Sequence, residues 1–197
     1  MLKKVVFTTA FVAVVAAAAW SAHMVTSPEV NPQDPIANAK ALMEQGETEQ
    51  ALSTLQNALK SGAKSESVYE LLGDLLLKQG NLAEAQQNFQ EALKLNTQNA
   101  KAFVGLGIVD LKQQNVNGAI QKFTLAMKAD PTSPEPYFQM GNLALGSGKP
   151  DVAMNFYRKA LGVDPNHAPT QQVVAQMTQM MQKALAAKET QGANPQS

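Results

Sequence analysis

The side chains that could do chemistry in this chain are few and widely spaced. The sequence holds two histidines, His23 and His167, and no cysteine. Neither histidine stands at helical spacing from carboxylates, so the sequence does not indicate a metal site, and we expect both to be solvated loop residues. The lack of cysteine excludes disulfides, thiol catalysis and thiolate metal ligands.

Motifs for catalysis are also missing. No serine stands in a nucleophile-elbow motif, and there is no glycine-rich phosphate-binding loop. The neighbouring carboxylates Glu47 and Glu49 fall in what reads as an exposed turn. The 16 basic and 16 acidic residues balance, so the charge does not favour a nucleic-acid partner. We therefore predict that the protein is not an enzyme and binds no cofactor and no metal.

Small residues recur through the middle of the chain at a constant step. Two alanines recur with a bulky residue between them, and a further small residue recurs upstream of each alanine pair. The upstream residues are Ala39, Gly73, Gly107 and Gly141. The downstream sets are Ala51, Leu55 and Ala58; Ala85, Phe89 and Ala92; Ala119, Phe123 and Ala126; and Ala153, Tyr157 and Ala160.

Each period reads as two short helices joined by a turn. In the second period, apolar residues at helical spacing indicate helices from about Ser67 to Gln79 and from Leu82 to about Leu95. The small residues fall where the two helices must approach closely. In the third period Gln114-Asn115 replaces the glycine turn, and we expect Asn115 to adopt the left-handed conformation.

This period of about 34 residues and its helix–turn–helix unit resemble the tetratricopeptide repeat. The resemblance covers Pro32 to His167 in four copies and implies an all-α fold. We expect a right-handed α-solenoid of four helix–turn–helix repeats with a C-terminal capping helix. The repeats are expected at residues 32–65, 66–99, 100–133 and 134–167. The first is degenerate because Pro35 stands where later copies carry an aromatic residue.

The segments outside the repeats have their own patterns. Residues 1–22 read as a signal peptide or an N-terminal membrane anchor, because Lys3 and Lys4 precede a long uncharged stretch. Cleavage after Ala19 and retention of Val5–Ala22 as an anchor both stay open. Either places the following residues on the periplasmic side of the cytoplasmic membrane if the source is bacterial. We expect a linker at 23–31, the capping helix at 168–187 and a disordered tail at 188–197.

The resemblance also implies a concave groove that is lined by the first helix of each repeat and binds peptides. The positions expected there are Ile36, Met43, Leu77, Val104, Ile108, Leu111, Phe138, Asn142 and Leu145. These residues are more apolar than a solvated helix face, and an exposed apolar stripe usually marks a binding site. The family's carboxylate clamp for heat-shock chaperone tails is not expected, because Glu70 and Asp74 place negative charge there.

We therefore predict a non-catalytic scaffold or adaptor that binds a helix or an apolar peptide segment of another protein and assists assembly of an envelope complex. Alternatively, the chain's own segment Met177–Leu185 folds back onto the stripe, or two molecules pair through it. Two other functions stay open. One is a self-associating structural protein, and the other is an accessory module of cytochrome c biogenesis, which rests on family analogy.

Overall fold

The computed structural model describes residues 34–192. The expected leader, the expected linker and residues 193–197 of the expected tail lie outside this part. All regular secondary structure in the described residues is α-helical. The helices are α1 (Pro35–Glu44), α2 (Thr48–Lys60), α3 (Glu66–Gln79), α4 (Leu82–Leu95), α5 (Ala100–Lys112), α6 (Val116–Ala129), α7 (Glu135–Gly146), α8 (Pro150–Val163) and α9 (Ala168–Gly192).

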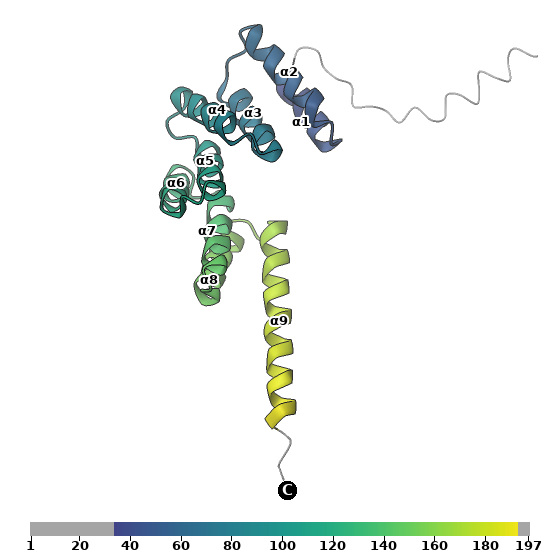
Figure 1. Cartoon of the computed structure of the whole chain (residues 1–197), viewed down its shortest axis with the longest axis vertical. Helices are drawn as coiled ribbons and strands as arrows, with labels where there is room; N and C mark the ends of the chain where they lie inside the picture. Colours follow the sequence, from purple (N-terminus) through teal and green to yellow (C-terminus); the bar gives the residue numbers. More distant parts are fainter. Residues whose placement is uncertain (1–33, 193–197) are drawn as a thin grey trace, which may run out of the picture.

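Helices α1 to α8 form four consecutive helix pairs, and each pair packs against the next. Figure 1 shows the pairs stacked into a curved array, with α9 running from the last pair away from the array. The first helix of one repeat also packs against the first helix of the next, as α3 does against α5. This arrangement confirms the predicted all-α solenoid with a C-terminal helix.

Side chains at the helix starts supply hydrogen bonds that the first turn cannot make for itself. The Asp34 carboxylate accepts the backbone N–H groups of Ile36 and Ala37, each at 3.0 Å, at the start of α1. The Asn99 side-chain oxygen accepts the Ala102 N–H at 2.8 Å at the start of α5. Pro35 is the first residue of α1, where its missing N–H costs nothing.

The turn between α5 and α6 differs from the sequence expectation. Gln114, and not Asn115, has the left-handed backbone, with φ 63°. Asn115 has φ −86° and caps α6, because its side-chain oxygen accepts the Gly118 N–H at 3.1 Å. Its amide also donates to Asp110 Oδ1 at 2.8 Å. The demand for a cap therefore decides which of the two residues takes the strained position.

The recurring small residues lie inside the solenoid, as the close-approach interpretation requires. Ala85, Ala119 and Ala153 have no exposed surface. A Cβ atom built on Gly73, Gly107 or Gly141 would lie 2.6, 2.5 or 2.4 Å from a ring carbon of the second helix of the same repeat. The rings concerned belong to Phe89, Phe123 and Tyr157.

Helix α9 continues to Gly192, beyond the expected end at Ala187. Its residues 188–191 are Lys-Glu-Thr-Gln, which do not interrupt a helix, and the first glycine after them is Gly192. The expected disordered tail is therefore helical as far as that residue. No helix within residues 34–192 has the length and hydropathy needed to cross a bilayer.

Candidate functional site

The predicted groove residues are all at least half-buried in the described structure. None of the nine is among the strongly exposed large apolar side chains of the described residues. Leu77 and Val104 are buried, with 9% and 7% of their surface exposed. The expectation was wrong for these two because their helices also pack against neighbouring repeats, so part of that face belongs to the core.

The other apolar positions are half-buried and divide among different parts of the molecule. Ile36 and Met43 pack against the cluster between the first and second repeats. Ile108 and Leu111 pack against the core of the third repeat. Leu145 lines a separate groove between α8 and α9. The buried sides of these residues therefore belong to different core clusters.

The segment Met177–Leu185 lies against the last repeat. Met177 is buried in a cluster that Phe138 and Leu145 also contact, but Met181 and Leu185 are each 60% exposed. The fold-back alternative therefore holds only for the fourth-repeat end of the predicted stripe, because α9 packs against α8 and not along α1, α3 and α5.

Charged side chains from three successive first helices interact across the concave surface. Asp74 and Glu70 come from α3, Lys101 from α5 and Glu135 from α7. Burial among protein atoms, followed by the Glu70 charge, raises the pKa of Asp74 from 3.8 to about 6. Lys78 and Lys101 oppose that rise but do not cancel it.

Asp74 nevertheless keeps an exposed side chain. A raised pKa and an exposed residue are compatible on a concave surface. There a carboxyl group can touch solvent while the neighbouring helices displace much of its hydration. The ionised form is therefore less well solvated than on a convex surface. The acidic centre lacks enough positive charge to offset this.

Asn99 fixes the position of Glu70. The Asn99 side chain is buried, its amide donates to the Glu70 carboxylate, and its oxygen caps α5. One side chain thereby joins α3 to the start of α5. The hydrogen bond holds one acidic group of the concave surface in place.

His167 is not the solvated loop residue that the sequence led us to expect. Its side chain is 13% exposed, and its Nε2 lies 3.4 Å from Glu135 Oε2. Its Nδ1 shares a 2.6 Å hydrogen bond with the hydroxyl of Thr170. Its ring meets Phe138 edge-on, with centroids 5.5 Å apart. The start of α9 covers this loop, and linear sequence does not reveal that contact.

Asn142 is held by the neighbouring helix. The Tyr157 hydroxyl donates to Asn142 Oδ1 at 2.8 Å, and burial raises the pKa of Tyr157. The Phe138 and Tyr157 rings lie 6.1 Å apart. Phe138 and Asn142 are therefore positioned by α8 as well as by their own helix, which gives this part of the surface a defined shape.

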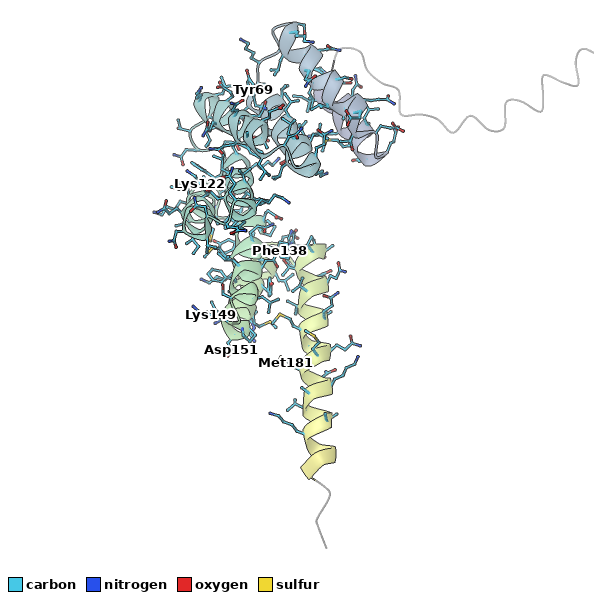
Figure 2. All side chains as sticks on the ribbon, in the orientation of Figure 1. Tyr69, Lys122, Phe138, Lys149, Asp151 and Met181 are labelled. Atoms are coloured by element: carbon cyan, nitrogen blue, oxygen red, sulfur yellow. The ribbon has the colours of Figure 1, made fainter. Side chains whose placement is uncertain are left out.

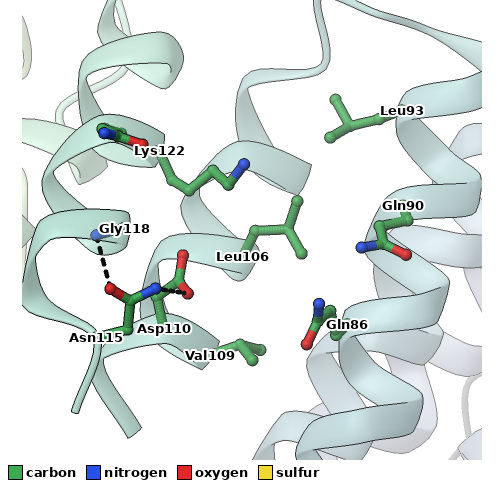
Figure 3. Close-up of a pocket in the computed structure, with 10 residues that line it drawn as sticks. Gln86, Gln90, Leu93, Leu106, Val109, Asp110, Asn115, Gly118 and Lys122 are labelled. Atoms are coloured by element: carbon green, nitrogen blue, oxygen red, sulfur yellow. Dashed lines mark hydrogen bonds between the residues drawn. The ribbon is translucent and has the colours of Figure 1, made fainter. Parts of the chain in front are cut away.

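Two further hollows lie away from the charged centre. One, of about 350 Å³, lies between α4, α5 and α6, where Figure 3 shows Asn115 bonded to Asp110 and Gly118. The other, of about 760 Å³, lies between α8 and α9. The second is lined by Met177, Met181 and Leu185, which belong to the expected capping helix.

The described residues contain no group of three or more potential metal ligands. The charged centre consists of carboxylates and lysines: Glu70 is bonded to Asn99, and Glu135 accepts a hydrogen bond from Gln139 and lies beside His167. This arrangement suits recognition of a partner chain by shape and charge. The fold and this surface together define an α-solenoid protein-interaction scaffold.

Comparison with known families places the chain more narrowly. Two tetratricopeptide repeat models match it, one at residues 36–85 and 70–134 and the other at 134–167. The chain belongs to the tetratricopeptide-repeat family. No curated protein matched the sequence.

Solved structures share the fold. MamA matches with 24% identity and a TM-score of 0.57, over 71% of this chain and 81% of its own. TTC0263 from Thermus thermophilus matches with 22% identity and a TM-score of 0.66, over 74% and 82%. YrrB, described as a tetratricopeptide protein with an unusual peptide-binding site, matches with 17% identity and a TM-score of 0.55, over 75% and 76%.

Proposed function

We propose that this protein is a non-catalytic scaffold that holds a segment of another protein against the concave surface of α3, α5 and α7. The observation that carries the proposal is the group of charged side chains that α3, α5 and α7 bring around Asp74, whose pKa is raised to about 6 by burial and then by the Glu70 charge. A Lys or Arg side chain from a partner would stabilise the ionised form. We expect the bound segment to carry such a basic residue.

Apolar side chains on the same helices favour a segment that is also partly apolar. Ile108, Leu111 and Phe138 are half-buried, so each keeps some surface for a ligand. Burial of such surface supplies affinity, whereas the charges set register and specificity. The peptide-binding site described for YrrB supports the same use of the fold.

We further propose that the scaffold works on the periplasmic side of a bacterial cytoplasmic membrane and assists assembly of an envelope complex. The support is the sequence of residues 1–22, in which two lysines precede an uncharged stretch. Fusion of alkaline phosphatase to the C-terminus tests the location, because that enzyme is active only after export. An inactive fusion would contradict it. The intact mass of the purified chain shows whether residues 1–19 are removed.

Site-specific cross-linking tests the groove. A photoreactive amino acid at Lys78, on the concave side of α3, should cross-link to a partner in the native membrane fraction. The same group at Gln87, an exposed position on α4, is the matched control and should not. Asp74→Lys should reduce the Lys78 cross-link about tenfold, because it replaces an attractive charge with a repulsive one.

The opposite results would reject the concave site. They are equal cross-linking from both positions, or a cross-link at position 78 that Asp74→Lys leaves unchanged. Circular dichroism of the variants verifies that each is folded. Mass spectrometry of the product identifies the partner and the cross-linked segment, which should contain a basic residue.

A further inference from the structure

The groove of about 760 Å³ between α8 and α9 repeats an earlier site of the solenoid. Several of its lining residues stand twice the repeat step after residues that line the smaller hollow between α4, α5 and α6. Among these pairs are Gln86 and Met154, Leu93 and Leu161, Leu106 and Val174, and Val109 and Met177.

The two sites differ in their third wall. At the earlier site α6 closes the hollow through Asn115, Gly118 and Lys122, and about 350 Å³ is left (Figure 3). At the later site no second helix follows α9 within residues 34–192. The groove is accordingly wider, and Figure 2 shows Asp151 and Met181 beside the opening between α8 and α9.

Helix α9 occupies the place of the first helix of a fifth repeat. It begins at Ala168, which stands twice the repeat step after Ala100, the start of α5. Thr170 and Met177, at the positions of Val68 and Leu75 in α3, are buried against the preceding repeat, as those two residues are. One face of α9 is therefore packed as a first helix should be.

The face that would meet a second helix is bare. Ala175 stands at the repeat position of Gly73, Gly107 and Gly141, yet its side chain is exposed. In the three glycine repeats, the ring from the second helix lies too close for a Cβ atom at this position. In the first repeat the pair is Ala39 with Leu55, and both are fully buried. By analogy with Ala39, we expect a helix that packs on Ala175 to carry leucine, and not an aromatic residue, at the position of Leu55.

We propose that this groove binds an amphipathic helix of a partner protein, which takes the place of the missing second helix. The helix carries Ala-x3-Leu-x2-Ala, as α2 does with Ala51, Leu55 and Ala58. The face of that helix that lies on α9 is uncharged, because α9 has no ionisable side chain from Ala168 to Gln182. The charged lining residues Asp151 and Arg158 belong to α8. This surface lies apart from the concave site and adds a second partner to the scaffold.

Other copies of this chain do not supply such a helix. The small–bulky–small sets of α2, α4, α6 and α8 are all buried within their own repeats. Helix α9 itself has Gln179 and Gln182 where the bulky residue and the second small residue would follow Ala175. The occupant that fits is therefore a separate protein.

The probe is a hydrocarbon-stapled peptide of residues Thr48–Lys60, stapled through the exposed positions 53 and 57. Fluorescence anisotropy with the full chain should show saturable binding. Thr178→Glu should weaken it about tenfold or more, because Thr178 lines the groove and stands at the repeat position of Leu76, which the second helix covers. Gln176→Glu adds the same charge outside the groove lining, at the repeat position of the exposed Asp74, and should leave binding unchanged. Both residues are exposed, so neither change threatens folding.

Size matching gives the sharper readout. Replacement of Leu55 by Phe in the peptide should weaken binding about tenfold, because the ring meets the Cβ atom of Ala175. Ala175→Gly in the protein should reverse that preference. A merely sticky apolar surface would not distinguish the two peptides in this way.

Three outcomes would overturn the proposal. They are absent peptide binding, binding that Thr178→Glu leaves intact, and a dimer in light scattering that Thr178→Glu dissociates, which would assign the groove to a second copy. Asp74→Lys serves as the independent variant and should not alter peptide binding. The concave site and this groove can therefore fail separately.

Discussion

The missing side chain of Gly107 decides how closely α5 and α6 approach. A Cβ atom there would lie 2.5 Å from Phe123 Cε1, closer than two carbon atoms can pack. The second and fourth repeats use glycine with an aromatic ring in the same way. The first repeat has Ala39 in place of glycine and Leu55 in place of the aromatic residue. The added methyl group of alanine is therefore matched by a smaller side chain in the second helix.

Gly107→Ala should therefore destabilise the protein in spite of the higher helix propensity of alanine. Overpacking lowers the free energy of unfolding by about 1–3 kcal/mol. The higher helix propensity of alanine raises it by about 1 kcal/mol. We expect a net loss of about 1 kcal/mol in urea denaturation. The double variant Gly107→Ala with Phe123→Leu should recover part of it, because that pair imitates Ala39 and Leu55.

Gly162→Ala is the matched control. Gly162 also lies within a helix, but a Cβ atom there would meet no other atom within 4 Å. This change should stabilise the protein by up to about 1 kcal/mol. Equal effects of the two alanine substitutions would show that propensity, and not ring contact, controls both positions.

Asp74 should make stability depend on pH. Its folded pKa of about 6 lies above the ordinary 3.8, so the folded state binds the proton more tightly than the unfolded state. The stabilising effect of the proton is complete below about pH 4 and is lost as the pH rises to about 6. Because the side chain is exposed, solvent screening keeps the effect below about 1 kcal/mol.

Carbon-13 NMR titration of the Asp74 carboxyl group measures this directly, and we expect a midpoint near pH 6. Glu70→Gln should lower the midpoint, because it removes a neighbouring negative charge. Asp74→Asn should abolish the change in stability between pH 4 and pH 6. A midpoint near 4 in the wild-type protein would contradict this description of the concave surface.

At the scale of the elements, the turns between helices do the same work with different residues. Gly80 and Gly148 close α3 and α7 with φ 82° and 72°. Gln114 adopts the equivalent left-handed backbone after α5 with φ 63°, where a side chain is strained. The third turn therefore stores strain that the other two avoid.

Gln114→Gly should relieve that strain and raise the free energy of unfolding by about 1 kcal/mol. Gln113→Gly is the matched control, since Gln113 has φ −88° and no strain to release. We expect it to leave stability unchanged or lower it. Thermal unfolding followed by circular dichroism measures both, and equal shifts would show that the strain is negligible.

At the scale of the whole molecule, each repeat contacts chiefly its neighbours. Stability in such an array is close to a sum of repeat and interface contributions, so terminal repeats open most easily. The first repeat has one neighbouring repeat, whereas the second and third each have two. The array should therefore open from its ends.

Leu55→Ala tests this neighbour dependence. It removes a fully buried side chain and should cost about 2–5 kcal/mol locally. Hydrogen exchange read by mass spectrometry should accelerate most in α1 and α2, less in α3, and little in α5 and α6. A uniform acceleration through all helices would instead indicate one cooperative unit.

The sequence by itself determined the helix pairs and their order. Alanine and glycine recur at a constant step, as at Ala85 and Gly73. They indicate helices in close contact, because a larger side chain at these positions would overlap the neighbouring helix in every repeat. The sequence also determined where helices start, because a capping side chain bonds to backbone groups only two or three residues away. These features depend on residues close together along the chain.

The tertiary structure decided which faces stay free. Leu77 and Val104 read as groove residues, but contact with the next repeat buries them. His167 read as a loop residue, but α9 places it against Glu135 and Phe138. Burial depends on which helix lies opposite, and that is set by the stacking of whole repeats. A single helix pattern records how apolar a face is, but not what covers it.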